Sequence, residues 1–381
     1  MQERMPEPRD VCGTSRRGFL QLGAATVATP ILGGLLSACG GGDGASSDKR
    51  ALNTILWSEQ YELSKPFEEK FGIKIRNRNA VDPVQSANMV KASPGEFDVV
   101  SFGPFDSPEV YDNMALPLDP DRIKDSWDAL YPYFQTMWDP AKFAPSTFDG
   151  QTYHISYQWG STVLAWNTKR IKETPKSWRI MMDPKYKGKT SFNDQSGDAY
   201  ATMRLSMGKE PNAYTAADFK ETEETAGQWF ENAKTLWSTG DDIKQLMVQE
   251  EVWVAHIWDG TARQMLKEGY PIDYTYPEEG VRGSVDGPGI MKGSKNIDDA
   301  YDLCNYMMTE EFGIRMGEEM FYASGNRHVA DKLKPDTQKI MRLDQMGKLL
   351  SDGKLILQKM QGPDFEALDA WWRKMKLKFQ A

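Results

Sequence analysis

Short apolar runs alternate with amphipathic stretches along most of the chain. Residues 52–56 have the apolar pattern of a buried strand, and residues 63–71 (LSKPFEEKF) have the spacing of a helix that ends at Gly72. Residues 73–75 predict the next strand, and residues 97–101 (FDVVS) repeat the strand pattern. This order of elements predicts an α/β fold, in which strands and helices alternate.

A second group of elements is predicted beyond residue 153. Residues 155–166 contain alternating apolar positions around Gly160, and residues 190–192 form a short strand that ends in Asn193 and Asp194. The remaining expected segments are a helix at 243–249, a strand at 251–257 (EVWVAHI), a glycine-rich crossing at 280–289, helices at 300–308 and 312–320, and a largely helical tail at 337–379.

The first 39 residues have the pattern of an export signal. Residues 15–20 (SRRGFL) match a twin-arginine signal, and residues 36–39 (LSAC) match a lipobox, whose cysteine receives a diacylglyceryl group. Residues 22–38 are too rich in Gly and Ala for a good spanning helix, which needs ~20 apolar residues. We therefore predict a twin-arginine lipoprotein signal peptide at 1–38, a lipid on Cys39 and a flexible tether at 39–50. The location expected is the periplasm or the cell surface, with the lipid anchoring the protein to a bacterial membrane.

Charge and cysteine content narrow the function. The formal net charge is −9, and it becomes −10 once the signal leaves with its four arginines and three acids. An acidic chain is unsuited to nucleic acid, so we expect no nucleic-acid partner. Of the three cysteines, Cys12 lies in the signal and Cys39 would be acylated, which leaves Cys304 alone. No disulfide is therefore expected within the mature chain.

Six blocks of sequence occur in the order found in one known family. They are residues 56–61 (LWSEQY), 149–160 (DGQTYHISYQWG), 177–189 (SWRIMMDPKYKGK), 257–260 (IWDG), 276–280 (YPEEG) and 285–286 (VD). Through these blocks nearly the whole mature chain resembles the periplasmic solute-binding proteins of the spermidine/putrescine type. Within the second block, Ser156 stands where the family usually has proline.

The resemblance implies both a fold and a function. The fold would be the two-lobed type II periplasmic-binding-protein fold, with a mixed sheet flanked by helices in each lobe and a ligand cleft between the lobes. Lobe 1 would comprise residues 51–154 and 285–328, and lobe 2 residues 155–284 and 329–381. The function implied is the binding component of an ABC importer, which captures a polyamine-like cationic amine and delivers it to a membrane permease driven by an ATPase. We expect a monomer without a cofactor.

The ligand-binding residues are also implied by the resemblance. An amine that enters a closed cleft loses its water, so it needs carboxylates for its charge and aromatic faces for its methylenes. In the family's pattern Trp258 would be a stacking wall and Asp286 an acid on the return crossing. The residues assigned to the ligand are Trp57, Ser58, Glu59, Tyr61, Phe102, Asp194, Trp258, Asp286 and Tyr322.

Each assignment has a structural alternative. Glu59 and Tyr61 could be solvated loop residues, and Asp194 could cap the helix that follows it. Trp258 could belong to the core, as aromatic residues often do. Asp286 could form a turn before the next glycine, although a glycine-rich crossing gives a structural acid little to cap.

Three departures from the family's pattern concern the identity of the ligand. Ser284 stands where the polyamine group usually has an aromatic residue. Gly197 stands near the position of a second acid, with Asp198 one residue away, and the loop at 101–106 is not the usual one. The ligand could therefore be a shorter amine, an amino-acid derivative, an opine or an aminophosphonate.

Catalysis and metal transport are the rival functions. The chain has no Gly-x-Ser-x-Gly and no His-Glu-x-x-His motif, and its three histidines are far apart in sequence. His256 lies in an apolar strand, which predicts a buried structural histidine, and Cys304 lies in an apolar helix, which predicts a core residue. No cluster of metal ligands is visible. We therefore predict a binding protein rather than an enzyme.

Overall fold

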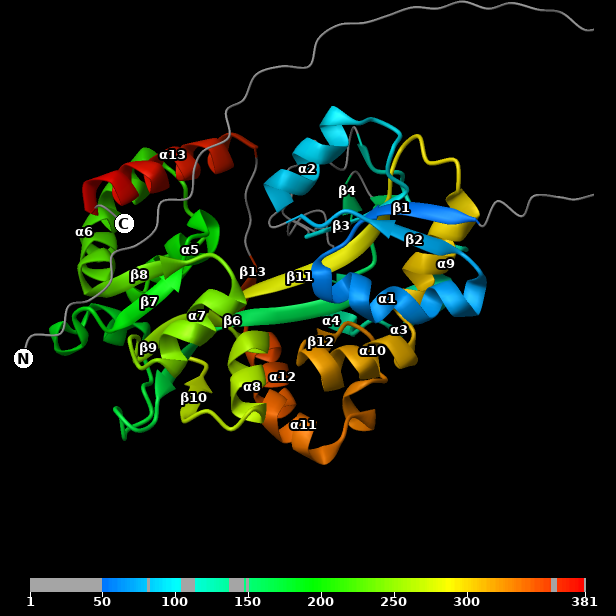
Figure 1. The fold of residues 1–381 in the computed structure, drawn as a ribbon. Helices are drawn as coiled ribbons and strands as arrows, with labels where there is room; N and C mark the ends of the chain where they lie inside the picture. Colours follow the sequence, from blue (N-terminus) through cyan, green and yellow to red (C-terminus); the bar gives the residue numbers. More distant parts are fainter. Residues whose placement is uncertain are drawn as a thin grey trace, which may run out of the picture. The chain divides into compact units, whose positions relative to one another are not determined.

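The structure is a computed structural model that describes residues 50–80, 83–103, 114–136, 147–148, 151–357 and 362–379 (Figure 1). Contacts divide the chain into Met1–Ser47 and the body, Asp48–Ala381. Several predictions fall on residues outside the described ranges: the signal peptide, the lipid on Cys39 and nearly all of the tether. Residues 104–106, in the loop that differs from the family's pattern, also lie outside them. Every described residue belongs to the body.

The body is built on one sheet with the strand order β2-β1-β3-β11-β6-β9-β7-β8, to which β10 and β12 add through β6 and β13 through β11. The strands are β1 (Ala51–Ile55), β2 (Lys74–Asn77), β3 (Val99–Phe102), β6 (Gln158–Asn167), β7 (Thr190–Asn193), β8 (Ala233–Trp237), β9 (Val254–Trp258), β10 (Ile272–Thr275), β11 (Val281–Ile290), β12 (Ala323–Ser324) and β13 (Leu355–Leu357), and a separate hairpin pairs β4 (Thr147–Phe148) with β5 (Gln151–Thr152).

Two long strands, β6 and β11, connect the two halves of this sheet. Strands β1, β2 and β3 are parallel, and the second half of β11 pairs antiparallel with β3. Strands β7, β8 and β9 are also parallel, and the second half of β6 pairs antiparallel with β9. The first halves of β6 and β11 pair with each other, so the two strands run side by side through the body (Figure 1). The expected glycine-rich crossing is thus a regular strand.

This arrangement is the predicted α/β fold, with helices packed on a mixed sheet. The lobe boundaries at 154/155, 284/285 and 328/329 remain a prediction. The first boundary precedes β6, and the second lies inside β11, among the residues that pair with β6.

Helices cover the sheet on both halves. They are α1 (Ser58–Phe71), α2 (Pro83–Ala92), α3 (Lys124–Ala129), α4 (Pro132–Thr136), α5 (Ser196–Ser206), α6 (Ala216–Asn232), α7 (Gly240–Val248), α8 (Asp259–Lys267), α9 (Ile297–Met307), α10 (Glu310–Arg315), α11 (Pro335–Met341), α12 (Leu343–Ser351) and α13 (Gly362–Phe379), with the 3-10 turns η3 (Trp178–Met182), η4 (Pro184–Tyr186) and η6 (Ala330–Lys332) and the π-helical turn η5 (Met316–Met320).

Helix α1 begins earlier than the apolar spacing predicted. It starts at Ser58 and ends, as expected, at Gly72, whose φ of 67° is left-handed and whose N–H donates to the Glu68 carbonyl. The early start places Glu59 and Tyr61 in a helical turn rather than in a loop. The loop alternative for these two residues is therefore wrong.

The carboxyl-terminal region differs most from the prediction. The expected single helix at 312–320 is α10 followed by η5, which ends at Phe321 with a left-handed φ of 60°. The expected helical tail is interrupted by β13, a three-residue strand that pairs in parallel with β11. A segment this short has no periodicity of its own, so its partner strand rather than its sequence decides its structure.

Aromatic side chains pack the last helix, α13, against helix α6. Trp371 stacks on Phe219, with ring centroids 5.8 Å apart, and Trp372 contacts Phe230 at 5.5 Å. At the end of α13, the Phe379 ring stacks on Phe230, also at 5.5 Å. Such pairs contribute to stability beyond their buried area, so these contacts stabilise the packing of α13.

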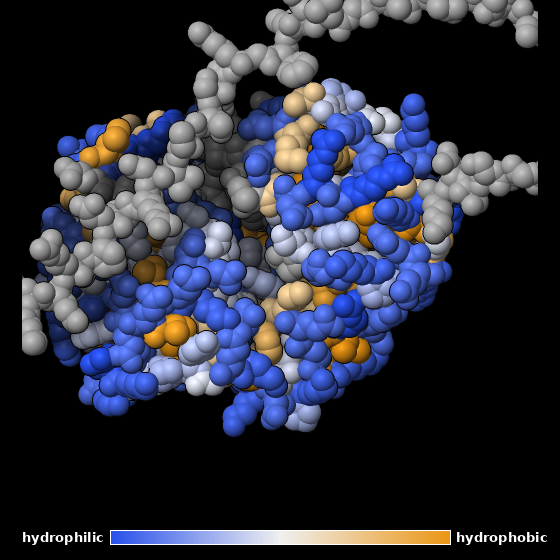
Figure 2. Space-filling model, viewed as in Figure 1, coloured by the Kyte–Doolittle hydropathy of each residue, from blue (hydrophilic) through white to orange (hydrophobic). Residues whose placement is uncertain are grey.

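Polar residues dominate the visible surface, and the residues predicted to be in the core are buried. The visible face in Figure 2 is largely hydrophilic, with small separate apolar areas. His256 and Cys304 are fully buried, as predicted, and burial raises the pKa of the Cys304 thiol to about 12. No helix in the described part of the chain has both the length and the apolar character that crossing a membrane requires.

Candidate functional site

The candidate site lies on one face of the central strands β6, β9 and β11. Residues that face each other across antiparallel strands point to the same side of the sheet. In this register Trp258 of β9 is opposite Thr162 of β6, and Asp286 of β11 is opposite Gln158. Thr162 and Gln158 share one face of β6, because alternate residues of a strand do. Two predicted site residues, Trp258 and Asp286, therefore lie on the same face.

Tyr322 joins this face through two glycines. A Cβ at Gly160, which lies between Gln158 and Thr162 on β6, would come within 3.2 Å of the Tyr322 ring. A Cβ at Gly260, in the first turn of α8, would come within 2.5 Å of the same ring. A side chain at Gly260 would collide with the tyrosine and one at Gly160 would crowd it, so the structure packs Tyr322 against β6 and the first turn of α8, which follows Trp258.

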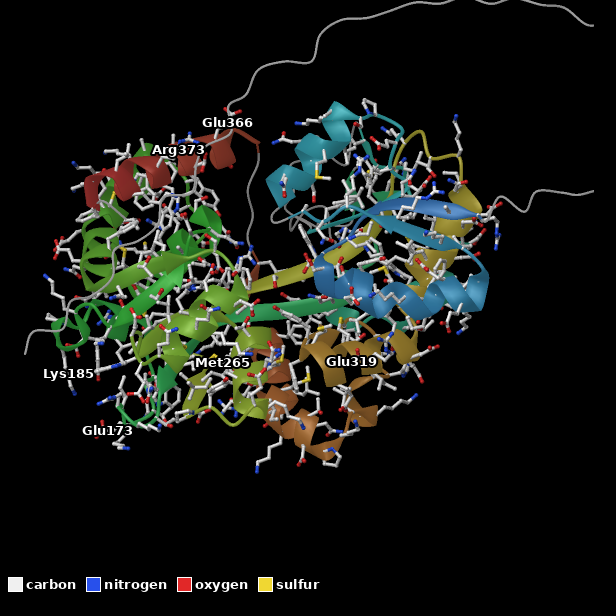
Figure 3. All side chains as sticks on the ribbon, viewed as in Figure 1. Glu173, Lys185, Met265, Glu319, Glu366 and Arg373 are labelled. Carbon is white, nitrogen blue, oxygen red and sulfur yellow. The ribbon has the colours of Figure 1, made fainter. Side chains whose placement is uncertain are left out.

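A buried ion pair holds the backbone that carries Tyr322. Arg263 and Asp259 are both fully buried on α8, with Nη2 3.0 Å from Oδ2. The same carboxylate oxygen accepts hydrogen bonds from the backbone N–H and the hydroxyl of Ser161. Arg263 donates to the carbonyl of Phe321 at 2.9 Å, directly before Tyr322. Figure 3 marks Met265 on α8 and Glu319 in η5, the helical turns on either side of this contact.

The electrostatics of the pair follow from its burial. Burial raises the pKa of the Asp259 carboxyl, and the Arg263 guanidinium and the Ser161 donors oppose that rise. Arg263 has three further partners, because its side chain donates to the hydroxyls of Tyr274 and Tyr276 and to Met346 Sδ. The arginine thus has several partners in a dry region, as a buried charge requires.

Asp194 follows β7 and is engaged by the last helix. Its carboxylate accepts a hydrogen bond from Trp372 Nε1 at 2.8 Å, and Lys376 Nζ lies 2.8 Å from both of its oxygens. Helix α5 has Gln195 as its N-cap. The capping alternative for Asp194 is therefore wrong, and its assignment to the ligand remains a prediction.

Trp258 is partly exposed rather than buried in the core. It is the last residue of β9 and the N-cap of α8, and its ring meets that of Trp237 edge-on at 4.8 Å. The carbonyl of Trp237 accepts a hydrogen bond from the backbone N–H of Asp194. The ends of three parallel strands, β7, β8 and β9, thus bring Asp194 and Trp258 to the same edge of the sheet.

The residues assigned in the first half of the sheet lie around the start of α1. Trp57 is the N-cap, and its backbone N–H donates to Gln60 Oε1 at 3.2 Å. Ser58 is exposed, and Tyr61 is partly buried with Lys65 Nζ 5.5 Å from its ring centroid. Glu59 is placed in α1.

Phe102, also assigned to the ligand, is buried at the end of β3. A Cβ at Gly289 would come within 2.4 Å of its ring, and the ring of His154 lies 5.6 Å away. Burial lowers the pKa of His154 to about 3, so this histidine is neutral. The described structure therefore places Phe102 in the core of the first half.

A polar network lies beside the site on the same face of β6. Asp198, in the first turn of α5, accepts hydrogen bonds from Thr162 at 2.7 Å and from Asn193 at 2.6 Å, and His256 Nε2 is 3.5 Å from its other oxygen. Burial favours a raised pKa for Asp198, but His256, Arg282 and Thr162 outweigh it and lower the pKa to about 2. Asp198 thus joins α5 to three strands.

One face of β11 carries opposite charges four residues apart, at Arg282 and Asp286. Arg282, Ser284 and Asp286 alternate along the strand and are each partly exposed. An extended strand separates the first and last of them by roughly 14 Å. Helix α5 packs against this strand. The positive charge of the Arg282 guanidinium helps to lower the pKa of the Asp198 carboxyl on that helix.

Two groups of residues near the site were not expected from the sequence. Asp259 and Arg263 have the four-residue spacing of a helical ion pair, a signal that a search for helical pairs would find. Trp372 and Lys376 have the same spacing on α13, but their partner Asp194 is 182 residues from Lys376. Nothing in the local sequence indicates that contact. Among the described residues, no group of three or more His, Cys, Asp and Glu is arranged to hold a metal ion.

Comparison with known proteins decides the family. The family of bacterial extracellular solute-binding proteins matches residues 62–341. The chain belongs to this family. Its members bind solutes, which confirms the prediction of a binding protein rather than an enzyme.

Curated relatives support the more specific resemblance. The chain is 23% identical over 316 residues to "Spermidine/putrescine-binding periplasmic protein 1" of Haemophilus influenzae, covering 80% of this chain and 85% of that protein. It is 22% identical over 301 residues to "Putrescine-binding periplasmic protein PotF" of Escherichia coli, covering 74% and 80%. The predicted resemblance to the spermidine/putrescine type is thereby confirmed.

A solved structure supports the fold. The spermidine/putrescine ABC transporter substrate-binding protein PotD of Streptococcus pneumoniae superposes with a TM-score of 0.72 at 21% sequence identity, covering 87% of this chain and 98% of that chain. At this identity the superposition establishes the fold alone, and it confirms the predicted two-lobed type II form.

Proposed function

We propose that this solute-binding protein is the lipid-anchored receptor of an ABC importer, which captures a small cationic amine between its lobes and delivers it to a membrane permease. Family membership supports the role of a receptor. The two curated relatives, named for spermidine and putrescine or for putrescine, support an amine as the ligand. The lipid on Cys39 rests on the lipobox at residues 36–39.

The observation that carries the amine proposal is the arrangement of Trp258, Tyr322 and Asp286 on one face of the sheet. Two partly exposed aromatic rings and one carboxylate lie on the same face of the central strands. Aromatic faces attract cations and cover methylene groups, and a carboxylate pairs with an ammonium group. These three side chains supply the types of contact that a small amine needs when it leaves water.

Asp286→Asn tests this proposal. Because the carboxylate would pair with the ligand's ammonium in a region shielded from water, we expect the substitution to weaken amine binding by ~2–5 kcal/mol. Calorimetric titration of the full-length protein with amines measures the change. Asp298→Asn is the matched control, because the Asp298 side chain is 92% exposed and pairs only with Arg122 among the described ion pairs.

A thermal-shift panel decides between amines and other solutes. The panel contains polyamines, amino acids, opines, aminophosphonates and metal ions, and a ligand that binds the native state raises the melting temperature. An increase with amines that Asp286→Asn abolishes supports the proposal. Unchanged amine affinity in Asp286→Asn, or an increase with metal ions and none with amines, would contradict it.

A further inference from the structure

We propose that the site selects ligands with a single ammonium group, because the chain supplies a second cation itself. That cation is Lys376 of α13, which occupies the carboxylate of Asp194. The inference rests on the proposed function, in which the ligand is an amine. It assigns to Lys376 the position that the second ammonium of a diamine would take.

Asp194 lies beside the proposed binding face. Strand β7 pairs in parallel with β9, with Thr190 opposite Val254 and Ser191 opposite Ala255. Continuing this register places Asp194 level with Trp258, at the same end of the two strands. A second ammonium on a ligand stacked at Trp258 would therefore meet the carboxylate of Asp194.

Lys376 makes the contacts that such an ammonium would make. Its Nζ is 2.8 Å from both oxygens of Asp194, and the indole N–H of Trp372 donates to one of them at 2.8 Å. The side chains of Asp194 and Lys376 are each 29% exposed, so the pair is partly withdrawn from water. A lysine ammonium and a ligand ammonium are the same chemical group, so exchanging one for the other gains no interaction energy.

The position of Lys376 is set by its helix. Trp372 and Lys376 are one turn apart and point to the same side of α13. The rings of Trp371, Trp372 and Phe379 pack against α5, α6 and β7 and hold this side over Asp194. Because the helix is fixed by these contacts, the lysine loses less side-chain entropy in forming the pair than a mobile surface lysine would.

The charges on β11 favour the same ligand class. Asp286 offers a carboxylate in the middle of β11, and Arg282 brings a guanidinium four residues earlier, near the start of the strand. A ligand with an ammonium at one end and a neutral or anionic group at the other would match this order of charges. A diamine would bring its second charge to a region that already contains Lys376 and Arg282, and it would lose hydration without gaining a partner.

Titration with three four-carbon probes tests the inference. The probes are 1-aminobutane, 4-aminobutanoate and 1,4-diaminobutane, titrated into the full-length protein at pH 7 and constant ionic strength. We expect at least one single-ammonium probe to bind about tenfold more tightly than the diamine, a difference of about 1.4 kcal/mol. Lys376→Met exposes the charge of Asp194, so it should raise the affinity for the diamine about tenfold and leave the preferred single-ammonium probe within about threefold.

Lys374→Met is the matched control. Lys374 is on the same helix as Lys376, and it pairs with Glu223 on α6 instead of Asp194. Its replacement by Met therefore removes the same charge without exposing Asp194. It should leave the ratio of diamine to single-ammonium affinity unchanged. Lys376→Gln is a second variant at the tested position, and far-UV circular dichroism checks that each variant is folded.

The outcomes separate this inference from the proposed function. Tightest binding of the diamine by the unaltered protein, or equal effects of Lys376→Met on all three probes, would overturn the inference. If Asp286→Asn still weakened the binding of amines in either case, the proposed function would stand. Binding of none of the probes, or binding unaffected by Asp286→Asn, would count against both.

Discussion

Asp259 and Asp194 follow neighbouring parallel strands, β9 and β7, and each carboxylate is paired with a cation from a helix. Asp259 pairs with Arg263, four residues away on the same helix, and both side chains are fully buried. Asp194 pairs with Lys376, 182 residues away on α13, and both side chains are 29% exposed. The two pairs have similar N–O distances, 3.0 and 2.8 Å, but they differ in burial, in sequence separation and in what surrounds them.

The difference in burial and surroundings indicates what each ion pair contributes to the protein. The buried arginine also holds the carbonyl of Phe321, so the pair fixes the backbone beside Tyr322. A buried charge that loses its partner is costly, whereas a partly exposed pair contributes little to stability. We therefore interpret the pair after β9 as part of the scaffold and the pair after β7 as a determinant of ligand charge.

Breaking the buried pair is expected to have the largest effect. Arg263→Met leaves the carboxylate of Asp259 buried and without its cation, so we expect a loss of ~3–5 kcal/mol in the free energy of unfolding. Urea denaturation of the full-length protein measures it. The double variant Asp259→Asn, Arg263→Met removes both charges and should recover part of the loss. A loss below about 1 kcal/mol for Arg263→Met would show that the two pairs are energetically alike.

The buried side chain of His154 stays neutral, so it can be compared with the buried ion pair of Asp259 and Arg263. The folded-state pKa of His154 is about 3, far below its ordinary 6.5, because burial opposes its charged form. The unfolded chain takes up a proton as pH falls below 6.5, and the folded chain does not until about pH 3. The contribution of His154 to stability is thus complete above pH 6.5 and declines by up to about 1.4 kcal/mol per pH unit between these values.

His154→Phe should flatten this decline, measured as the slope of unfolding free energy against pH between 6.5 and 4. The slope, rather than the absolute stability, is the readout, because the larger ring changes the packing near Phe102. His328→Phe is the control, since His328 is exposed. Equal slopes in the unaltered protein and in His154→Phe would show that this histidine does not contribute to acid sensitivity.

The partly exposed pair should give the smallest change. Lys376→Met removes one contact from a carboxylate that water still reaches, so we expect a loss of only ~0–1 kcal/mol in the free energy of unfolding. The same denaturation experiment, with Lys374→Met beside it, measures the change. A loss as large as that of Arg263→Met would place both pairs in the scaffold.

Much of the sheet could be predicted from local patterns. The strand predicted at 190–192 is β7, Thr190–Asn193, and the helix predicted at 63–71 ends at Gly72 as α1 does. Apolar runs and helix-ending glycines are local signals, so the sequence contains them directly. The start of α1 was missed because its first turn, with Ser58 and Glu59, is polar and has no apolar spacing.

The site was predictable only as far as its family motifs reach. Trp258, Asp286 and Tyr322 were assigned by resemblance, and the structure brings them to one face. Phe102 was assigned in the same way and is buried, because packing against Gly289 depends on the pairing of β3 with β11. The contact between Asp194 and Lys376 also depends on tertiary structure, which no local pattern reports.

The position of Lys376 on the last helix has a consequence for the order in which the chain folds. The pair of Asp259 and Arg263 can form as soon as one turn of α8 exists, since only four residues separate them. Asp194 must wait for nearly the whole remaining chain, and closing so long a loop costs entropy before the contact repays it. A folding intermediate without a docked α13 would therefore carry an unneutralised Asp194, and the internal cation would arrive among the last native contacts.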